Sequence, residues 1–489
     1  MNINVDSIII DGDDIIQGAM TNLDKSGARG VFVVDGGKKL LGVITDGDIR
    51  RALLAGRNFQ TKAREIMNAN PVTATRKSSV GQLMEKMAQI GAQLIPVVDN
   101  NNVVVDVVFP QDIKTIPLSS PDITRKEIDL INQVLSTSTL SIGPRVMEFE
   151  QKIADYVGVK YAVAVNSGTS GLHLCVRGMG IKDGDEVITT PFSFIASANC
   201  ILFERAKPVF ADIDPDTLCL DPEKIEEKIT AKTKAILPVH VFGHSCDMEK
   251  ISFVAKKHNL AVIEDACEAI GAEYKNKKAG SFGDCAVMAF YPNKQITTAE
   301  GGMVLTDNEN IARLCRSMRN QGRSDGGAWL SHERLGYNYR MSELGAAMGV
   351  GQMDRIDEIL GKREGIAGKY SSRLENIEGI IIPQVSRYVK MSWFVYVVRL
   401  DSAIFSRQMR DQVMDELKSN NISCNNYFPP IHLEPFYVDL FGYRKNDFPV
   451  AERISESTIA LPFYNNLMED EIDYICCSLK RIIKHISKR

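Results

Sequence analysis

Hydrophobic and polar positions divide the chain into two stretches with different patterns. In the first stretch, GVFVVDGGKKLLGVITDGDI (residues 30–49) is followed by the similar run QLIPVVDNNNVVVDVVFPQDI (residues 93–113). Three pairs of short segments keep a constant offset of 64 residues: Gly27-Ala28 with Gly91-Ala92, Val33-Val34-Asp35 with Val97-Val98-Asp99, and Asp48-Ile49 with Asp112-Ile113. Each copy predicts a helix, an apolar strand, a polar turn, a second strand and a helix that begins near the aspartate. Residues 1–116 are therefore predicted to form a small pseudo-symmetric α/β domain.

From residue 160 onward, short apolar runs alternate with segments of helical periodicity. The runs are YAVAV, EVITT, KPVFA, KAILPV and LAVIE. This alternation predicts a mostly parallel sheet covered by helices, with ligands beyond the carboxyl ends of the strands. Residues 115–121 contain two prolines and no periodicity, so they are predicted to be a linker.

Composition narrows the function classes. The 489 residues carry a formal net charge of −4 and contain no basic run, which argues against nucleic-acid binding as the main task. No apolar stretch reaches the ~18–20 residues that span a bilayer, and the acidic N-terminus lacks a signal-peptide pattern. Ten scattered cysteines without a CxxC pair indicate reduced thiols, so we expect a cytoplasmic protein without a membrane segment.

Four segments that follow apolar runs carry candidate chemistry. They are residues 166–171 (NSGTSG), residues 191–194 (PFSF), Asp265 after LAVIE, and Lys294 between CAVMA and a Gly-Gly turn. Each has an ordinary alternative: a helix cap, a core aromatic, a helix N-cap and a solvated lysine, respectively. Together they offer a phosphate cradle, a stacking ring, a pyridinium partner and a Schiff-base lysine, which are the groups that pyridoxal phosphate needs. No metal site is predicted.

The segment Val43–Ile49 (VITDGDI) carries the first resemblance. Residues 1–116 resemble the tandem domain pair named after cystathionine β-synthase, the CBS pair, in which adenine nucleotides bind between the two copies. The resemblance implies that Thr45, Asp46 and Asp48 contact a regulatory nucleotide. In the second copy Phe109 replaces the threonine, although Asp112 remains, so one site is expected rather than two. The alternatives are a helix cap at Asp48 and a module that only dimerises or spaces the enzyme.

The second resemblance covers residues 117–489. The phrases LSIGPRVMEFE, NSGTSGLHL, PFSFIASAN, EDACEAIGA, FYPNKQITTAEGGM, LGYNYRMSELGAA and YFPPIHLEPFY are similar, in collinear order, to those of nucleotide-sugar aminotransferases of fold type I. The resemblance implies a large domain over residues 117–370, with a mostly parallel sheet of the seven-stranded type. It also implies a smaller C-terminal α/β domain over residues 371–489.

The same resemblance assigns roles residue by residue. Lys294 would form the Schiff base with pyridoxal 5′-phosphate, and Asp265 would pair with the pyridinium nitrogen. Phe194 would stack on the cofactor ring, and Glu268 would lie beside its phenolate oxygen. The cofactor phosphate would be held by Gly168, Thr169 and Ser170. Asn338 would reach the cofactor of the neighbouring subunit. The last contact implies a homodimer or larger assembly with shared active sites. Two positions depart from the common pattern, Ala289 where relatives have serine and Glu268 where they have glutamine or histidine.

The resemblance further implies glutamate as the amino donor and a nucleotide-linked 4-keto-6-deoxy sugar as the acceptor, giving a 4-amino sugar nucleotide for surface polysaccharide or glycan synthesis. Four residues of YFPPIHLEPFY would line the acceptor side, unless this segment is only a turn: Tyr427, Phe428, His432 and Tyr437. Amination at C3 remains an alternative. Related dehydratases carry histidine at the lysine position, so Lys294 argues against that activity. A nucleotide sensor with a degenerate enzyme half is the alternative from another class.

Overall fold

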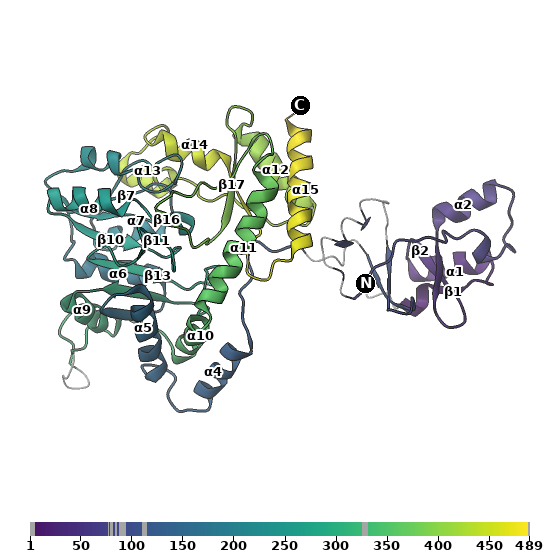
Figure 1. Cartoon of the computed structure of the whole chain (residues 1–489), viewed down its shortest axis with the longest axis horizontal. Coiled ribbons are helices and arrows are strands. Elements are labelled where there is room, and N and C mark those ends of the chain that lie inside the picture. Colours follow the sequence, from purple (N-terminus) through teal and green to yellow (C-terminus); the bar gives the residue numbers. More distant parts are fainter. Residues whose placement is uncertain are drawn as a thin grey trace. The chain divides into compact units, whose positions relative to one another are not determined.

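The computed structural model describes residues 5–76, 78, 82–83, 86–87, 94–109, 115–324 and 331–487 (Figure 1). The chain forms two compact units. The first contains Met1–Ile116 with Ser419–Ile422 and Met468–Leu479, and the second contains Pro117–Lys418, Ser423–Leu467 and Lys480–Arg489. Residues on both sides of position 370 belong to the second unit, so the division between a large and a small domain at that position stays a prediction.

The sequence repeat of the first unit is visible in its strands. The first copy has η1 (Val5–Ile8), β1 (Ile9–Asp11), α1 (Ile16–Ser26), β2 (Gly30–Val34), β3 (Leu40–Thr45) and α2 (Asp46–Leu54), followed by η2 (Ala63–Glu65). Strand β1 pairs in parallel with β2, and β2 pairs antiparallel with β3. The second copy contains the antiparallel pair β4 (Ile95–Val98) and β5 (Val104–Val108).

The two copies share details of register at the offset of 64 residues. The β2–β3 pair shifts register between Val33 and Val34, and the β4–β5 pair shifts between Val97 and Val98. The parallel pairing of Ile10 with Val33 recurs as a bridge between Ala74 and Val97. Matching irregularities of this kind confirm the predicted pseudo-symmetric pair. The predicted partners Gly91-Ala92 and Asp112-Ile113 lie outside the described residues.

A seven-stranded sheet organises the second unit. Its order is β6 (Tyr161–Val165), β14 (Gly302–Thr306), β13 (Cys285–Ala289), β10 (Ala261–Asp265), β9 (Thr233–Leu237), β7 (Glu186–Thr189) and β8 (Lys207–Phe210). Among these strands, β14 runs antiparallel to both of its neighbours, β6 and β13, and the other neighbouring pairs are parallel. The strands are almost wholly buried, as expected where helices cover both faces. The predicted mostly parallel sheet is therefore confirmed.

Helices cover the sheet and extend the unit (Figure 1). Helix α5 packs on β6, α6 on β13 and β14, α8 on β9 and β10, and α9 on β6 and β14. Their bounds are α5 (Pro144–Val157), α6 (Gly168–Gly178), α8 (Met248–Lys257) and α9 (Glu309–Arg319). The same unit also contains α4 (Arg125–Leu135), α7 (Ala196–Leu202) and α10 (Glu343–Met353). Short segments complete this part: η4 (Pro222–Lys224), η5 (Glu226–Lys228), η6 (Val241–Gly243), β11 (Glu273–Tyr274) and β12 (Lys277–Lys278).

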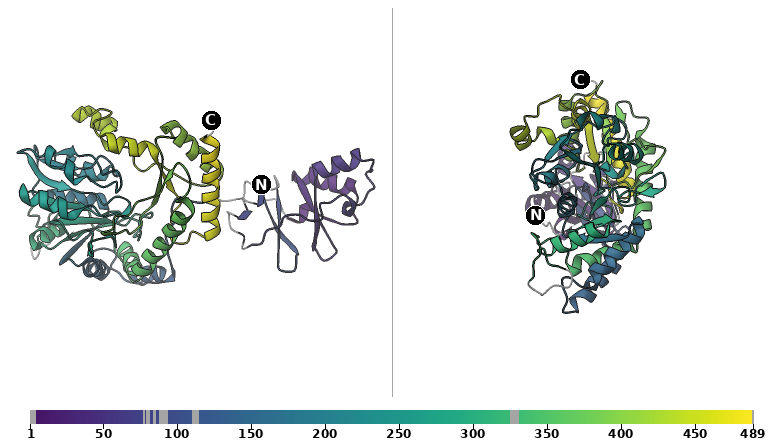
Figure 2. Two further views of the ribbon diagram at one scale, coloured as in Figure 1. Left: turned by 45° about the horizontal axis from the view of Figure 1, so that its top comes forward. Right: turned by 90° about the vertical axis from the view of Figure 1, so that its left-hand side faces the viewer.

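The C-terminal part begins with the long helix α11 (Ile356–Leu374), green in Figure 1 and Figure 2. Strand β16 (Val389–Lys390) joins β11 and β12, whereas β15 (Ile380–Ile381), β17 (Tyr396–Leu400) and β18 (Thr458–Leu461) form a separate antiparallel sheet. The remaining elements are α12 (Arg407–Ser419), η7 (Ile431–Leu433), α13 (Pro435–Phe441), α14 (Pro449–Ser457) and α15 (Glu469–Ile486). Within the described residues, no helix combines the length and apolarity needed to cross a membrane.

Candidate active site

The loops that carry the candidate chemistry begin at one edge of the seven-stranded sheet. Asp265 is the last residue of β10, Lys294 lies five residues beyond β13, and α6 begins three residues after β6. The loops touch: a Cβ atom on Gly168 would lie 2.7 Å from Ala289 Cβ and 3.0 Å from Cys267 Sγ. Glycine at position 168 therefore lets the start of α6 approach the ends of β13 and β10. The parallel sheet brings together residues that are far apart in sequence, as the strand pattern predicted.

Asp265 is held by hydrogen bonds to both of its carboxylate oxygens. Ser197 Oγ donates to Oδ2 at 2.6 Å, and the backbone N–H of Cys267 donates to Oδ1 at 3.1 Å. Asp265 is 5% exposed, so its carboxylate has little contact with water. Because a carboxylate offers about four acceptor sites, two donors leave it able to accept the N–H of a ligand. Asp265 is a candidate partner for a cationic ligand nitrogen.

Lys294 is enclosed rather than solvated. Its side chain is 13% exposed in the loop between β13 and β14, where its backbone N–H donates to Tyr291 O at 2.9 Å. Lys294 Nζ lies 3.4 Å from Glu268 Oε1 and 3.9 Å from the centre of the Phe394 ring. A surface lysine would extend into water, because its ammonium is strongly hydrated. The geometry therefore favours a functional amine at this position.

Glu268 stands beside that amine in an environment that favours its neutral form. Burial raises the pKa of the Glu268 carboxyl above its usual value, and the positive charge of Lys294 opposes this effect. The backbone N–H of Phe242 donates to Glu268 Oε2 at 2.9 Å. A carboxyl that retains its proton does not repel an anionic oxygen and can donate a hydrogen bond to it. The burial of Glu268 reduces the electrostatic conflict that its sequence position suggested.

The N-terminus of α6 offers an anion site. Ser167 caps the helix by accepting the N–H of Ser170 at 3.1 Å, and Ser170 Oγ donates to Asn166 Oδ1 at 2.6 Å. The Ser170 hydroxyl is thus engaged within the loop, whereas Thr169 is half-buried at the helix start. Strand β14 approaches closely, since a Cβ on Gly302 would lie 2.5 Å from Ser167 O. Backbone N–H groups of the first turn lack helical partners and suit a phosphate.

Phe194 presents an exposed ring next to the Asp265 support. It follows β7 and is 61% exposed, although Phe192 nearby is fully buried. The Phe194 carbonyl accepts the N–H of Ser197 at 3.2 Å, so one short segment positions both the ring and the hydroxyl that binds Asp265. A large exposed ring beside a buried carboxylate suits stacking on a flat heterocycle.

Asn338 lies beside the loop that precedes α6. Its backbone carbonyl accepts a hydrogen bond from Asn166 Nδ2 at 3.4 Å, and Asn166 N–H donates to Tyr339 O at 2.9 Å. Asn338 is exposed in the single chain. Its contact with a neighbouring subunit stays a prediction.

The residues predicted on the acceptor side fall into two groups. Tyr427 is half-buried, and its burial raises the pKa of its hydroxyl. Phe428, His432 and Tyr437 are buried, the last two with no exposed surface. His432 Nε2 lies 3.1 Å from Glu452 Oε1, and the Tyr437 hydroxyl donates to Asn199 Oδ1 at 2.9 Å. These contacts favour the structural alternative for the three buried residues and leave Tyr427 as the candidate that faces substrate.

Two contributors to the site have no strong signal in the sequence. Ser197 lies within PFSFIASAN, but one serine in a helix does not predict a bond to Asp265, which lies 68 residues away. Phe394 lies 100 residues beyond Lys294 in an ordinary apolar run. Only the packing of the C-terminal part against the sheet brings its ring to the amine.

The described residues fit pyridoxal phosphate as the sequence predicted. The exposed Phe194 ring, the fixed Asp265 carboxylate and the enclosed Lys294 amine follow strands of one sheet, and the segments after β10 and β13 approach the start of α6. No group of three histidine, cysteine, aspartate or glutamate residues within the described part of the chain is arranged to hold a metal ion. Amine, carboxylate, ring and anion site are the set that this cofactor requires.

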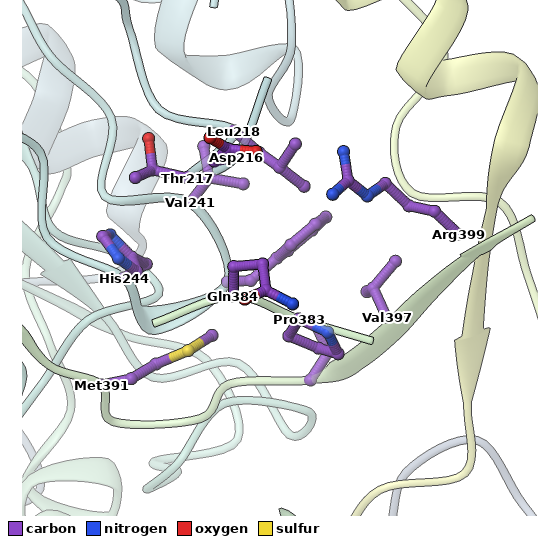
Figure 3. Close-up of a pocket in the computed structure, with 12 residues that line it drawn as sticks. Asp216, Thr217, Leu218, Val241, His244, Pro383, Gln384, Met391, Val397 and Arg399 are labelled. Atoms are coloured by element: carbon purple, nitrogen blue, oxygen red, sulfur yellow. The ribbon is translucent and has the colours of Figure 1, made fainter. Parts of the chain in front are cut away.

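A second, small cavity lies between β17 and the segment that follows β9, and its lining residues are not those of the candidate active site (Figure 3). Its volume is about 20 Å³, and His244 and Arg399 face it from opposite sides. Arg399 also donates to Pro215 O at 2.6 Å. A space of this size holds about one water molecule, so it is too small for a sugar or a nucleotide.

The first unit contains a larger cavity at its predicted nucleotide motif. Its volume is about 610 Å³, and both copies line it. Thr45 and Asp48 form a capping box at the start of α2, in which Asp48 Oδ2 accepts the Thr45 N–H at 2.8 Å. Asp48 Oδ1 also pairs with Arg51 at 2.6 Å. Thr45 is therefore the N-cap of α2, and Asp48 is the third helical residue that completes the capping box rather than the N-cap itself. Asp46, Asp48 and two arginines line the cavity, Arg29 and Arg51.

Comparisons with known proteins agree with both parts of the chain. Residues 121–480 match the DegT/DnrJ/EryC1/StrS aminotransferase family, and residues 3–55 and 63–118 each match the CBS domain. GDP-perosamine synthase of Caulobacter vibrioides is 40% identical over 374 residues, which are 76% of this chain and 99% of that protein.

Two solved structures have a similar fold. The Helicobacter pylori aminotransferase PseC, involved in the biosynthesis of pseudoaminic acid, matches with a TM-score of 0.73 and 29% identity over 76% of this chain and all of its own. The PLP form of Streptococcus pneumoniae Spr1654 matches with a TM-score of 0.73 and 29% identity, over 76% of this chain and 99% of its own.

Proposed function

Since the chain belongs to the DegT/DnrJ/EryC1/StrS aminotransferase family and uses pyridoxal 5′-phosphate, we propose that it aminates a nucleotide-linked 4-keto-6-deoxy sugar with glutamate as donor. The product would be a 4-amino sugar nucleotide for a surface polysaccharide or glycan. The observation that carries the proposal is that a fixed Asp265 ends β10 while an enclosed Lys294 follows the neighbouring strand β13. The match to an aminotransferase family argues against a degenerate enzyme half.

We assign the cofactor contacts from this geometry. Lys294 is the amine that bonds to the cofactor, and Asp265 accepts the N–H of the ring nitrogen. Phe194 covers one face of the ring, and the first turn of α6, with Gly168, Thr169 and Ser170, holds the phosphate. Glu268 lies on the phenolate side, where burial raises the pKa of its carboxyl.

When bound, the cofactor supplies an aldehyde that captures amines and a ring that absorbs negative charge. The residues of the chain manage protons around that ring. Asp265, whose carboxylate oxygens accept hydrogen bonds from Ser197 Oγ and the Cys267 N–H, would hold a proton on the ring nitrogen. Lys294 Nζ, when it is not bonded to the cofactor, would accept the proton from the donor's Cα as a base and give it back as an acid. In the second half of the reaction the same nitrogen would deliver a proton to the acceptor's carbon.

The choice of acceptor draws on the relatives. The Caulobacter vibrioides relative is named for GDP-perosamine, and its match covers 76% of this chain. Tyr427, the half-buried member of its segment and a neighbour of Glu268, is the candidate contact to the sugar. Incubating the enzyme with glutamate and a panel of GDP-, UDP- and dTDP-linked 3-keto and 4-keto sugars tests the proposal. Amination of a 3-keto sugar alone would overturn the assignment to C4.

We also propose that the active site is shared between two copies of the chain. Asn338 would contact the cofactor phosphate held by the neighbouring subunit, which is consistent with its exposed position in the single chain. Its backbone contact with Asn166 places this segment next to the chain's own phosphate loop. Two adjacent sites related by a twofold axis would let each segment serve the partner.

The first unit is proposed to bind one adenine or related nucleotide in the cavity of about 610 Å³. Such a volume suits a nucleotide, since ligand pockets commonly measure ~300–1,000 Å³. Arg29 and Arg51 offer positive charge for phosphate, and Asp46 and Asp48 offer acceptors for ribose hydroxyls. Calorimetry with the full-length protein and adenine, guanine and uridine nucleotides tests this proposal.

A further inference from the structure

Arg363 is a buried arginine on α11 that contacts the segment packed against Lys294. It is 3% exposed. Its Nε donates to Trp393 O at 2.7 Å, its Nη2 donates to Phe394 O at 2.7 Å, and its Nη1 donates to Asn465 Oδ1 at 2.9 Å. One rigid guanidinium thus fixes two successive carbonyls and a side chain from a later part of the chain.

The burial of the Arg363 guanidinium is energetically unfavourable. Within the described residues, no carboxylate lies within ion-pair distance of it, and burial lowers the pKa of Arg363 to about 9. Burying a charge without an opposite partner costs free energy, so such residues are usually kept for a geometric or functional reason. The Phe463 ring, 4.8 Å from the guanidinium carbon, offsets part of the cost.

The segment that Arg363 holds is also tied to the cofactor loops. Trp393 has a positive φ of 54°, a conformation that side-chain-bearing residues adopt only when neighbouring contacts hold it. Ser392 Oγ accepts a hydrogen bond from Gln295 Nε2 at 2.9 Å, and Phe394 N–H donates to Phe242 O at 3.1 Å. The same Gln295 nitrogen donates to Glu268 O at 2.6 Å.

These contacts end at the candidate catalytic amine, because the Phe394 ring centre lies 3.9 Å from Lys294 Nζ. We propose that Arg363 is a positioning residue that, through the backbone of Trp393 and Phe394, holds the Phe394 ring against Lys294 and so fixes the direction of its amine. The inference rests on the proposed role of Lys294. It adds a residue that lies 69 positions from that lysine and acts on it through the backbone of Trp393 and Phe394.

The arrangement has two physical consequences. A ring face attracts an ammonium and restricts the rotamers of a flexible four-carbon side chain. It also covers the amine against water, in agreement with the low exposure of Lys294. Loss of the ring position should make the amine more accessible while making it a worse catalyst, since reaction requires a well-aligned nitrogen.

The first test measures the reactivity of the amine without the cofactor. Full-length protein stripped of pyridoxal phosphate is labelled with trace acetic anhydride, and acetylation of Lys294 is compared with that of Lys278 in the same sample by mass spectrometry. We expect Arg363→Lys and Phe394→Leu each to increase the relative labelling of Lys294 about 3-fold to 10-fold. Phe394→Leu leaves the backbone acceptors of Arg363 in place, so it tests the ring even if Arg363→Lys folds poorly.

The matched control is Arg410, which is also 3% exposed and also donates to two backbone carbonyls, Ser455 O at 3.1 Å and Thr458 O at 2.9 Å. Arg410→Lys removes comparable bonds without touching the Phe394 segment. It should destabilise the fold to a similar extent and leave Lys294 labelling unchanged. If Arg410→Lys raises the labelling as much as Arg363→Lys, general loosening explains the effect and the inference is wrong.

Kinetics of the loaded enzyme provide the second readout. Arg363→Lys and Phe394→Leu should each lower kcat about 10-fold to 100-fold, with KM changed less than about threefold. The double variant should be no slower than the worse single variant, because both changes remove the same ring contact. Factors that multiply in the double variant would overturn the inference. Failure of the proposed function would appear separately, as full activity in Lys294→Ala.

Discussion

Ser197 Oγ lies 2.6 Å from Asp265 Oδ2, so a hydroxyl at the start of α7 anchors the carboxylate at the end of β10. The two residues are buried, and the serine leaves Asp265 able to accept a further donor. The same serine is tied to the Phe194 carbonyl, so the proposed stacking ring and the proposed partner of the ring nitrogen share one support. The relationship explains how a short loop can position both residues.

Asp265→Asn should lower kcat by at least about 100-fold while the protein stays folded. The reason is loss of a buried charge beside a ring nitrogen, an electrostatic contribution worth several kcal/mol in such sites. Ser197→Ala should lower kcat by a smaller factor, about 10-fold, because it weakens the support without removing the charge. Steady-state kinetics and circular dichroism check both. A loss below about tenfold in Asp265→Asn would mean that Asp265 is only a structural acceptor.

Lys294→Ala and Lys294→Arg should abolish turnover and the yellow absorbance of the lysine-bound cofactor. Alanine has no amine, and the guanidinium of arginine forms no stable imine. Absorbance spectra and coupled assays for 2-oxoglutarate formation measure the two effects. Lys278, a partly exposed lysine that pairs with Glu273, provides the control Lys278→Ala, which should keep both properties. Near-normal transamination in either Lys294 variant would remove the central claim.

Glu268 should make the stability of the cofactor-free protein depend on pH. Burial raises its pKa in the folded state above the usual value near 4.5, so folding favours the protonated carboxyl. Its contribution to stability is therefore fully present below about pH 4.5 and is lost as the pH rises through the folded-state pKa. Urea unfolding at several pH values should show a smaller loss in Glu268→Gln than in the wild type over this window.

Glutamine keeps an acceptor for the Phe242 N–H, so Glu268→Gln should also retain activity within about tenfold at neutral pH. The unfolding free energy could instead fall equally with rising pH in the wild type and in Glu268→Gln. That result would show that Lys294 keeps Glu268 charged at all these pH values. In that case Glu268 would contribute as an anion rather than as a neutral donor.

Asn338 variants should reveal whether active sites are shared. Lys294→Ala and Asn338→Asp should each be inactive or severely impaired, because the aspartate would repel the cofactor phosphate. Mixing the two proteins under conditions of subunit exchange should restore part of the activity, since some mixed dimers contain one intact site. Full activity of Asn338→Asp alone would refute the shared-site assignment.

Asp48 variants should separate nucleotide binding from helix capping. Asp48→Ala removes both the carboxylate and the capping box with Thr45, whereas Asp48→Asn keeps an acceptor for the Thr45 N–H. We expect both to lose nucleotide binding by calorimetry, and only Asp48→Ala to lose about 1 kcal/mol of stability. Pyridoxal phosphate absorbance should be unchanged in both. Normal binding in Asp48→Asn would assign Asp48 to the cap alone.

If the nucleotide regulates the enzyme, the coupling free energy equals the difference between the nucleotide's binding free energies for two states of the enzyme. Such couplings are commonly ~1–3 kcal/mol, which corresponds to a shift of roughly 5-fold to 150-fold in substrate affinity. Kinetics of the full-length enzyme with and without the bound nucleotide measure this shift. Unchanged kinetics with a saturated site would mean that the first unit binds nucleotide without regulating catalysis.

The sequence by itself determined the parts of this protein that depend on local pattern. The offset of 64 residues predicted the paired strands of the first unit, because a duplicated pattern of apolar positions folds into a duplicated structure. Alternating apolar runs predicted the parallel sheet, and the carboxyl ends of its strands identified Asp265 and the segment around Lys294.

The tertiary structure decided which side chains meet. It buried His432 and Tyr437, which their sequence segment had suggested for substrate contact, and it placed Ser197 on Asp265 and the Phe394 ring on Lys294. These pairs lie 68 and 100 residues apart, and periodicity carries information only about neighbours within one element. Contact over such separations depends on how the C-terminal segments pack onto the sheet, and that packing is a property of the whole fold rather than of any motif.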